Sequence, residues 1–403
     1  MFVREEIQKI NETLDKSFRN NKCKFAVGEY ETCLKDAINK HAPYSKCAFI
    51  CNKQTYTQHF SSIEKAIKDQ GGKLISFIKE NSQLSVDNAC ELFNLPEDVR
   101  AVIVMDNELF DITSYYANVK GIPVIEIVKS VALSNIMSPV LYVKNEKVFD
   151  RITITAKKII IIDEKLISDE QMANAYADIM SKLSAFCDYR INGIVWGKAL
   201  NKTAYDLARN AVTSEYALFN QPKEKRLTFT LINGIKLHTA NYLSNGELFN
   251  SSGAYVVGKY LGNEVELYAS KCLLGVYDTC INFDYSNLLS IPDYYGRAVS
   301  VSNYLNSDVE QIIEYTNKVL KVLRPSLIRA NVVLKNLWAE VNSLNKLTST
   351  VQNTYQALGG KILSKDQKLQ IISAIRFCGD SFYGVNAMTV LRENGITDTE
   401  YFL

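Results

Sequence analysis

Two polar residues that could take part in ligand chemistry, Asp106 and Asn107, follow directly on the apolar run Ala101–Met105. The run has the composition of a buried strand, and the turn after such a strand faces the ligand in nucleotide-binding folds. A dinucleotide site places glycines in this turn, so that the backbone can approach the phosphates closely. Here the turn carries side chains, and the Asp106 carboxylate would face phosphate groups. The turn therefore has the position of a nucleotide site without the usual phosphate cradle.

The elements around this turn follow the pattern of a βαβ unit. A helical segment is predicted from Leu109 to Val119, and Gly121 ends it. A second apolar run, Ile122–Ile127, is interpreted as another buried strand. The two strands are expected to be parallel and joined by a right-handed crossover.

Histidine and cysteine usage limits the metal chemistry that the sequence can support. The chain has only three histidines, His41, His59 and His238, so a zinc hydrolase site needing two or three of them is hard to build. The nine cysteines are scattered, and the pair Cys47 and Cys51 fits no common zinc spacing. We interpret these cysteines as buried free thiols.

The order of apolar runs predicts two domains. Up to Asp163, strands alternate with helices, which is typical of an α/β fold with a mostly parallel sheet. Beyond it helical periodicity dominates, so we place the boundary there: residues 1–163 form a nucleotide-binding-type α/β domain and residues 164–403 a mostly helical domain. The long helices expected in the second part are Glu170–Ile191, Lys202–Ala217, Asp308–Val322, Ser326–Leu344 and Asp366–Phe377.

Composition and charge are those of an ordinary globular protein, with 47% hydrophobic and 22% charged residues. A formal charge of +2 gives no electrostatic case for binding nucleic acid. No apolar run approaches the roughly 20 residues that span a bilayer. The first residues lack the layout of a signal peptide, and we expect a cytoplasmic protein without a membrane span.

The segment Ala175–Ile191 (AYADIMSKLSAFCDYRI) resembles a helix of the iron-containing alcohol dehydrogenase and dehydroquinate synthase superfamily, with sn-glycerol-1-phosphate dehydrogenase as the closest member. Asp178 corresponds to the metal-binding aspartate of that helix and Lys182 to its lysine. The resemblance implies a dehydroquinate synthase-like fold and makes Asp178 and Lys182 the candidate catalytic residues. Their spacing of four is also that of a structural ion pair on one helix face, and we weigh the two roles equally.

The central stretch resembles the same family at Asp111, at Gly121–Pro123 and at Ser138–Pro139. The resemblance implies cofactor-binding positions, and each of them departs from the family pattern. The three-glycine turn corresponds to Met105, Asp106 and Asn107, and the aspartate near the adenosine ribose corresponds to Asn52. The family's Pro-Thr pair and the aspartate after it correspond to positions including Lys129 and Ser134. The candidate cofactor-binding residues are Asn52, Asp106, Asn107, Lys129 and Ser134.

The family's metal ligands are replaced as well. The segment SNGELFNSS places Leu248 and Ser252 where the family has histidines, and no histidine follows His238 anywhere in the chain. With Asp178 as the one remaining ligand, we predict no metal site, and metal as a cofactor is not expected. The resemblance leaves NAD(P) open as a cofactor.

Two functions are consistent with these residues. The first is a glycerol-1-phosphate dehydrogenase-like protein that lacks metal-dependent hydride transfer and acts as a binding or partner subunit, that is, a pseudoenzyme. The alternative is an active NAD(P)-dependent oxidoreductase acting on a polyol or polyol phosphate through a rebuilt site. Lys129, Lys182 and Lys202 would then surround a phosphate, with Asp178 and Glu247 as acid or base. In either case we expect a small-molecule ligand in a cleft between the domains, and homo- or hetero-oligomers remain open.

Overall fold

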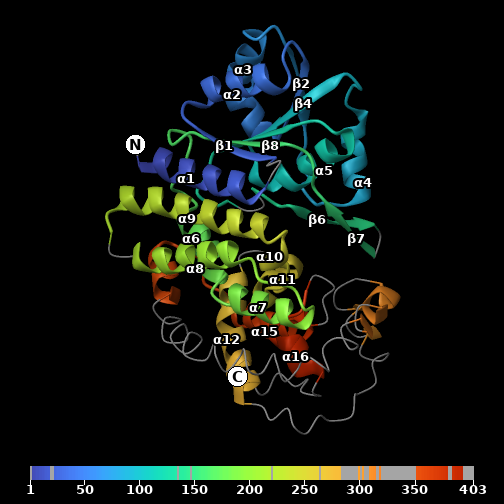
Figure 1. Ribbon diagram of the computed structural model, residues 1–403, viewed down its shortest axis with the longest axis vertical. Helices are drawn as coiled ribbons and strands as arrows, with labels where there is room; N and C mark the ends of the chain where they lie inside the picture. The colour runs from blue at the N-terminus through green and yellow to red at the C-terminus, as the bar shows by residue number, and fades with distance from the viewer. Residues whose placement is uncertain are drawn as a thin grey trace. The chain divides into compact units, whose positions relative to one another are not determined.

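The computed structural model describes residues 2–18, 22–133, 136–145, 148–218, 221–262, 265–282, 298–299, 302–303, 308–314, 317–318, 351–379 and 384–393. The chain divides into two compact units. Figure 1 labels most of the helices and strands. Unit 1 comprises Met1–Gln171 and Lys223–Leu243, and unit 2 comprises Met172–Pro222 and Ser244–Leu403. The helix Lys223–Leu243 thus groups with unit 1, although it lies in the stretch that the sequence assigns to the helical domain.

The described part of unit 1 is built on a six-stranded sheet in which all neighbouring strands are parallel. The four inner strands of this sheet are buried along nearly their whole length, as expected when helices cover a parallel sheet on both sides. In spatial order the sheet runs β1-β8-β5-β4-β2-β3, and β6 and β7 form a separate antiparallel hairpin. The bounds are β1 Cys23–Val27, β2 Lys46–Cys51, β3 Lys73–Ile78, β4 Val99–Val104, β5 Val124–Val128, β6 Val140–Asn145, β7 Val148–Thr153 and β8 Lys158–Ile162.

Helices cover the two faces of this sheet. α2 (Tyr30–His41) and α3 (Lys53–Lys68) pack on one face, where alternate residues of β2, β4, β5 and β8 form a single apolar core with them. α5 (Phe110–Lys120) follows β4 and packs on β4 and β5. Its Ser114 contacts Glu126, which points away from that core, so α5 covers the opposite face. The expected α/β architecture with a parallel sheet is confirmed.

The predicted βαβ unit is present and begins with a tight turn. β4 leads into a short 3-10 helix, η2 (Asn107–Leu109), then into α5 and β5. Gly121 ends α5 with φ at 66°, and its N–H bonds back to the carbonyls of Ala117 and Asn118. Glycine adopts this left-handed conformation without the strain that a Cβ would add, which explains why the helix ends there.

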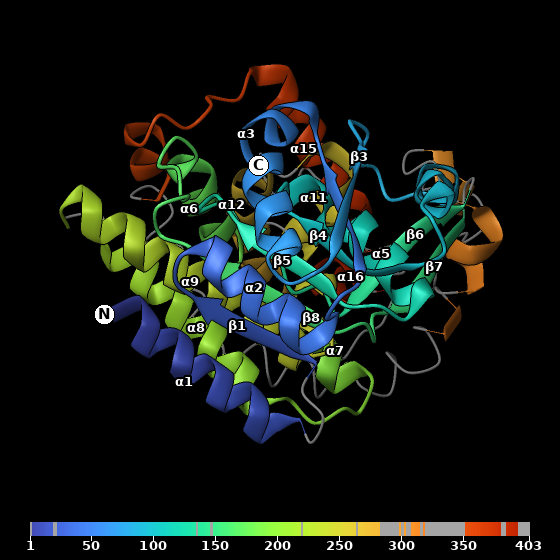
Figure 2. The same ribbon diagram turned by 90° about the horizontal axis from the view of Figure 1, so that it is seen from above.

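Two helices that lie far apart in the sequence pack side by side in unit 1: α1 (Phe2–Ser17) and α9 (Lys223–Leu243) (Figure 2). The rings of Phe2 and Phe229 have centroids 5.0 Å apart, and the Lys236 ammonium lies 3.1 Å from a carboxylate oxygen of Glu6. These contacts account for the grouping of α9 with unit 1.

Unit 2 is helical throughout its described part, in agreement with the predicted mostly helical C-terminal region. Within the described residues, no helix combines the length and the apolar character needed to cross a bilayer. The bounds are α6 Met172–Ser181, α7 Ala185–Val195, α8 Lys202–Ala217, α10 Glu247–Asn250, α11 Gly253–Leu261, α12 Glu266–Asn282, α15 Lys365–Cys378 and α16 Ala387–Glu393; unit 1 also contains α4 Val86–Cys90 and η1 Glu91–Asn94.

The prediction of one continuous helix over Glu170–Ile191 was wrong. The chain forms α6 and α7 with a turn at residues 182–184. The Ser181 hydroxyl donates to the Asp178 carbonyl, and the N–H groups of Lys182 and Leu183 bond three residues back instead of four. A serine that competes for a helix carbonyl disturbs the helical ladder, which accounts for the break.

The other helices predicted beyond residue 200 are described to different extents. Lys202–Ala217 is confirmed as α8, and Asp366–Phe377 is confirmed within α15. Of Asp308–Val322, only residues 308–314 and 317–318 are described, and Ser326–Leu344 lies outside the described residues.

Candidate functional site

The topology of the sheet in unit 1 changes direction at the carboxyl ends of β2 and β4, and we call this switch point the crevice. These strands are neighbours, yet the helices that follow them, α3 and α5, pack on opposite faces. Helices that leave neighbouring strands in opposite directions open a crevice between them, and open α/β sheets bind ligands there. Asn52 follows β2 and Asp106 follows β4, so both stand at this point.

The N-terminus of α3 is capped by side chains of the protein itself. Asn52 is the N-cap residue, and its side-chain oxygen accepts from the N–H of Thr55 at 2.8 Å. The N–H of Lys53 donates to Glu80 at 3.0 Å, and the N–H of Asn52 donates to Asp106 at 2.8 Å. Three N–H groups that a helix could offer to a phosphate therefore already have acceptors.

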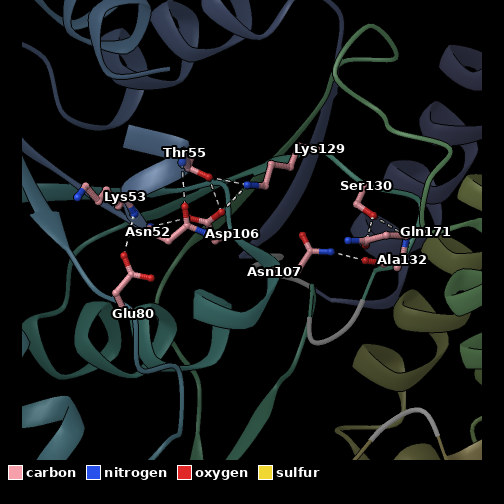
Figure 3. Close-up of polar contacts among 10 residues, drawn as sticks. All are labelled: Asn52, Lys53, Thr55, Glu80, Asp106, Asn107, Lys129, Ser130, Ala132 and Gln171. Atoms are coloured by element: carbon pink, nitrogen blue, oxygen red, sulfur yellow. Dashed lines mark hydrogen bonds and ion pairs between the residues drawn. The ribbon is translucent and has the colours of Figure 1, made fainter. Parts of the chain in front are cut away.

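Asp106 is at the centre of this network (Figure 3) and its side chain is fully buried. One carboxylate oxygen accepts from the Asn52 N–H, and the other accepts from the Thr55 hydroxyl at 2.6 Å and from the Lys129 ammonium. Lys129 also donates to the Thr55 hydroxyl oxygen at 2.6 Å. The burial of Asp106 is thus stabilised by an ion pair and by hydrogen bonds to both of its oxygens.

Asn107, the next residue, is hydrogen-bonded on one side only. Its side-chain N–H group donates to the carbonyl of Ala132, whereas its side-chain oxygen is buried and has no hydrogen-bond partner among the described residues. Nearby, the Ser130 hydroxyl donates to the side-chain oxygen of Gln171 at 2.7 Å and accepts from the Ala132 N–H at 3.1 Å (Figure 3). An unpaired buried oxygen leaves room for a donor, such as a hydroxyl or amide of a ligand.

The structure thus brings three of the five candidate cofactor residues into direct contact: Asn52, Asp106 and Lys129. Asn107 adjoins them, and Ser134 lies outside the described residues. The arrangement does not fit the pyrophosphate of a dinucleotide held in the usual way. Side chains fill the turn that should carry glycines, and the nearby N–H donors are bonded to carboxylate and amide oxygens.

The candidate catalytic residues lie in a second cluster, in unit 2. The Lys182 ammonium donates to Asp178 at 3.1 Å, to the Ser181 hydroxyl at 2.9 Å and to Glu266 at 2.5 Å. It also lies 5.2 Å from the ring centroid of Phe249, which adds a cation–π contact. The ion pair predicted between Asp178 and Lys182 is confirmed, and Glu266 is a second, more deeply buried partner.

The electrostatics of this cluster favour a charged lysine. Burial lowers the pKa of Lys182, but the carboxylates of Glu266 and Asp178 outweigh that effect and hold it above its ordinary value. Burial raises the pKa of Glu266, and the positive charge of Lys182 opposes the rise. A charged lysine is a poor general base, so Lys182 is suited to positioning and charge compensation rather than to proton abstraction.

A glycine makes room for this cluster. Gly258 on α11 faces Glu266, the first residue of α12, and a Cβ added at Gly258 would lie 2.3 Å from the Glu266 Cγ. Any larger residue at this position would therefore displace Glu266 from Lys182 or push α11 and α12 apart.

The residues of unit 2 do not fit a catalytic metal bound in the way that the resemblance implies. Asp178 is bonded to an ammonium, and Leu248, which replaces a histidine ligand, is fully buried in α10. Where the chain is described, no three His, Cys, Asp or Glu side chains come together as metal ligands. One carboxylate that is already paired with a lysine is a weak basis for binding a transition metal.

Two further charged residues of unit 2 have structural contacts. Glu247, proposed as an acid or base, pairs with Lys198. Asp188 is buried and accepts from the N–H groups of Gly253 and Ala387 at 3.0 and 3.1 Å, so one carboxylate caps the first residues of both α11 and α16. Negative charge at a helix N-terminus is stabilising, which gives Asp188 a role in holding unit 2 together.

Three important residues were not predicted from the sequence: Thr55, Glu266 and Glu126. Thr55 had a local signal, since Asn52 and Thr55 have the spacing of an N-cap residue and its bonded N–H. Glu126 had one too, because a carboxylate interrupts the apolar run of β5. Glu266 had none, since only the packing of α12 on α6 brings it to Lys182.

Glu126 forms a buried ion pair inside the sheet of unit 1. One of its oxygens accepts from Lys158 at 3.1 Å and from Ser114 at 3.3 Å, while the other has no hydrogen-bond partner among the described residues. Burial raises the pKa of Glu126 to about 7, and Lys158 opposes the shift.

Comparison with known proteins adds evidence on the fold. No protein-family model and no curated protein sequence matches the chain. It is similar to the structure of an iron-containing alcohol dehydrogenase with a TM-score of 0.57 and 10% identity, covering 93% of this chain and 98% of that one. For an iron-containing alcohol dehydrogenase of Thermotoga maritima the TM-score is 0.56 and the identity 9%, covering 92% and 96%.

A third similar structure is the glycerol dehydrogenase of Schizosaccharomyces pombe. Its TM-score is 0.52 and its identity 13%, covering 94% of this chain and 89% of that one. The chain therefore has the fold of the iron-containing alcohol dehydrogenases, as the resemblance in its sequence implied.

Proposed function

We propose that this chain has kept an oxidoreductase fold without metal-dependent hydride transfer and acts as a binding or partner subunit. The observation that carries the proposal is the position of the Lys182 ammonium between Asp178 and Glu266. By resemblance, Asp178 would be a metal ligand. Here its carboxylate is paired with the Lys182 ammonium, and the buried Leu248 stands where the resemblance puts a histidine ligand, so a metal ion would find one carboxylate that is already engaged.

The crevice of unit 1 supports the same proposal. In a working dinucleotide site, the turn after β4 and the nearby helix N-terminus present backbone N–H groups to the pyrophosphate. In this chain, Asp106 and Glu80 accept from those groups at α3. A pyrophosphate would have to displace carboxylates and would approach the buried charge of Asp106, so the binding of NAD(H) or NADP(H) in that manner is unfavourable.

The alternative is an active oxidoreductase with a rebuilt site, and one feature favours it. The side chain of Lys129 is 30% exposed, and the side-chain oxygen of Asn107 is buried without a hydrogen-bond partner in the described part of the chain. Together they offer a cation and an acceptor to a small ligand at the crevice. The resemblance makes polyols and polyol phosphates the first ligands to test under either proposal.

A cofactor assay separates the two proposals. The purified chain is incubated with NAD(H) or NADP(H), zinc, iron or nickel, and ethanol, glycerol or glycerol 1-phosphate, while absorbance of the reduced cofactor is followed. Calorimetric titration with each cofactor runs in parallel. We expect neither turnover nor cofactor binding. Turnover that is abolished in Asp178→Asn would contradict the proposal and establish the alternative.

A further inference from the structure

A pocket of about 530 Å³ lies in unit 1 at the edge of the sheet opposite to the crevice. It opens where β1, β5 and β8 begin, since Lys22, Pro123 and Lys157 each immediately precede one of these strands. His41, the last residue of α2, and Thr155 also line it, and Ile122 gives it an apolar wall. Small-molecule sites have volumes of roughly 300–1,000 Å³, so this pocket has the size of a ligand site.

Positive charge gathers at this pocket without matching carboxylates. The Lys157 ammonium lies 3.3 Å from Nδ1 of His41. None of the ion pairs formed between described residues involves Lys22, Lys40 or Lys157. The ammonium of Lys24, which is also nearby, lies 4.0 Å from a carboxylate oxygen of Asp15. The pocket lining therefore contains two lysines and a histidine but no acidic residue.

The pKa values of His41 and Lys157 reflect burial first and the repulsion of neighbouring positive charges second. Burial lowers the pKa of His41, and the charges of Lys157, Lys40 and Lys24 lower it further. Burial also lowers the pKa of Lys157, with Lys40 and Lys24 adding to the effect. Like charges that repel one another in a concave site are stabilised when an anion enters.

The carboxyl ends of two helices, α2 and α5, lie at the same edge of the sheet. Their partial negative charges offset part of the positive charge of these lysines. A helix C-terminus carries a partial charge of roughly −0.5, so the two ends offset about one lysine. Lys22, Lys40 and Lys157 therefore still give this edge an excess of positive charge over the partial negative charges of the helix ends.

We propose that this pocket binds a small molecule through a phosphate group. Lys22 and Lys157 would hold the phosphate oxygens as point charges, and His41 would donate to them once protonated. Ile122 and Pro123 leave an apolar wall for the organic part of the ligand. The site is distinct from the Asp106 crevice and from the Lys182 cluster, and it does not depend on whether the chain is an enzyme.

Binding of pyrophosphate and of inorganic phosphate to the full chain tests the proposal, by calorimetry at low and high ionic strength. The variants are Lys157→Gln and Lys22→Gln, which keep most of the side-chain stem. Lys68→Gln is the matched control, because Lys68 is an exposed lysine of unit 1 on α3 that pairs with Glu64. We expect each pocket variant to weaken binding about tenfold, the control to leave it unchanged, and added salt to weaken it in the wild type.

A second readout follows the site directly. The imidazole signals of the three histidines are recorded by NMR against pH, and His41→Gln assigns the signal of His41. A bound phosphate should raise the pKa of His41, because it offsets the charges of Lys157, Lys40 and Lys24 that face it. Equal binding by wild type, pocket variants and control, absence of binding to wild type, or a pKa of His41 that phosphate does not move would overturn the proposal.

Discussion

Lys182 and Glu266 lie 84 residues apart in the chain and form an ion pair in which both side chains are almost completely buried, at 2% and 4% exposure. Asp178, in the last turn of α6 and four residues before Lys182, is a second acceptor for the same ammonium. The positive charge that these two carboxylates share is thus supplied by a side chain of the protein, Lys182. The ammonium of Lys182 therefore compensates the charge of the carboxylate that, by resemblance, would be a metal ligand.

Removing that cation should destabilise the chain strongly. In Lys182→Met, Glu266 keeps a buried charge without its partner, and breaking a buried pair costs about 3–5 kcal/mol. Adding Glu266→Gln to the same variant should recover part of the loss. Denaturant unfolding of the single and double variants measures both effects. Lys198→Met, at a more exposed pair with Glu247, serves as control and should cost less than about 1 kcal/mol. If Lys182→Met and Lys198→Met lowered the free energy of unfolding by the same amount, the stabilising role of the buried pair would be contradicted.

Gly258→Ala should disturb the same cluster without removing any charge. The new Cβ would meet the Glu266 side chain, and overpacking of this kind costs about 1–3 kcal/mol. The matched control is Gly275→Ala on α12, where an added Cβ has nothing within 4 Å and a helical alanine is favourable. Thermal unfolding midpoints should fall for the first variant and stay the same or rise for the second. The cost of Gly258→Ala should shrink in a Glu266→Ala background, because the clash is then relieved.

Asp106 should matter for stability at the crevice of unit 1. Asp106→Ala leaves the Asn52 N–H, the Thr55 hydroxyl and the Lys129 ammonium without their acceptor, and an unsatisfied buried group costs about 1–3 kcal/mol. Asp106→Asn keeps one acceptor oxygen and should cost less. Urea unfolding followed by circular dichroism would show this order. Asp98→Asn, which breaks an exposed pair with Lys46, is the control. If Asp106→Ala behaved like the control, the network would contribute nothing to folding.

The buried carboxyl group of Glu126 should make stability depend on pH. Its pKa is raised from 4.5 to about 7 by burial, so the folded state binds the proton more tightly than the unfolded chain does. Stability from this group is therefore present below pH 4.5 and is lost as the pH rises towards 7, by on the order of 3 kcal/mol. Glu126→Gln, which cannot ionise, should remove this contribution. The difference in unfolding free energy between wild type and variant, measured from pH 4.5 to 7.5, gives the slope; a constant difference would contradict it.

Much of unit 1 could be predicted because its signals are local. The apolar run of β4, the end of α5 at Gly121 and the isoleucines of β8 each define an element without reference to the rest of the chain. Parallel pairing then follows from the alternation of strands and helices. The packing of α9 on α1 could not be predicted, since it depends on contacts between residues more than 200 positions apart, such as Phe2 and Phe229.

The site was predictable only in part, for the same reason. Asp178 and Lys182 are four residues apart, so their ion pair could be inferred from spacing, although Lys182 lies in the turn that follows α6. Lys129 could be named as a position near the crevice, but its pairing with Asp106 depends on the order of strands in the sheet. Glu266 reaches Lys182 only through the packing of α12, and the break between α6 and α7 arises from a serine hydroxyl that periodicity does not register.

The most direct test of the central claim is the metal content of the protein under competition. The chain is dialysed without oxygen against micromolar zinc, iron or nickel, and the bound metal is measured by mass spectrometry for wild type and for Asp178→Asn. We predict that both retain the same small background, because the ammonium of Lys182 already compensates Asp178 and Glu266. One tightly bound ion per wild-type chain that is lost in Asp178→Asn would contradict the claim.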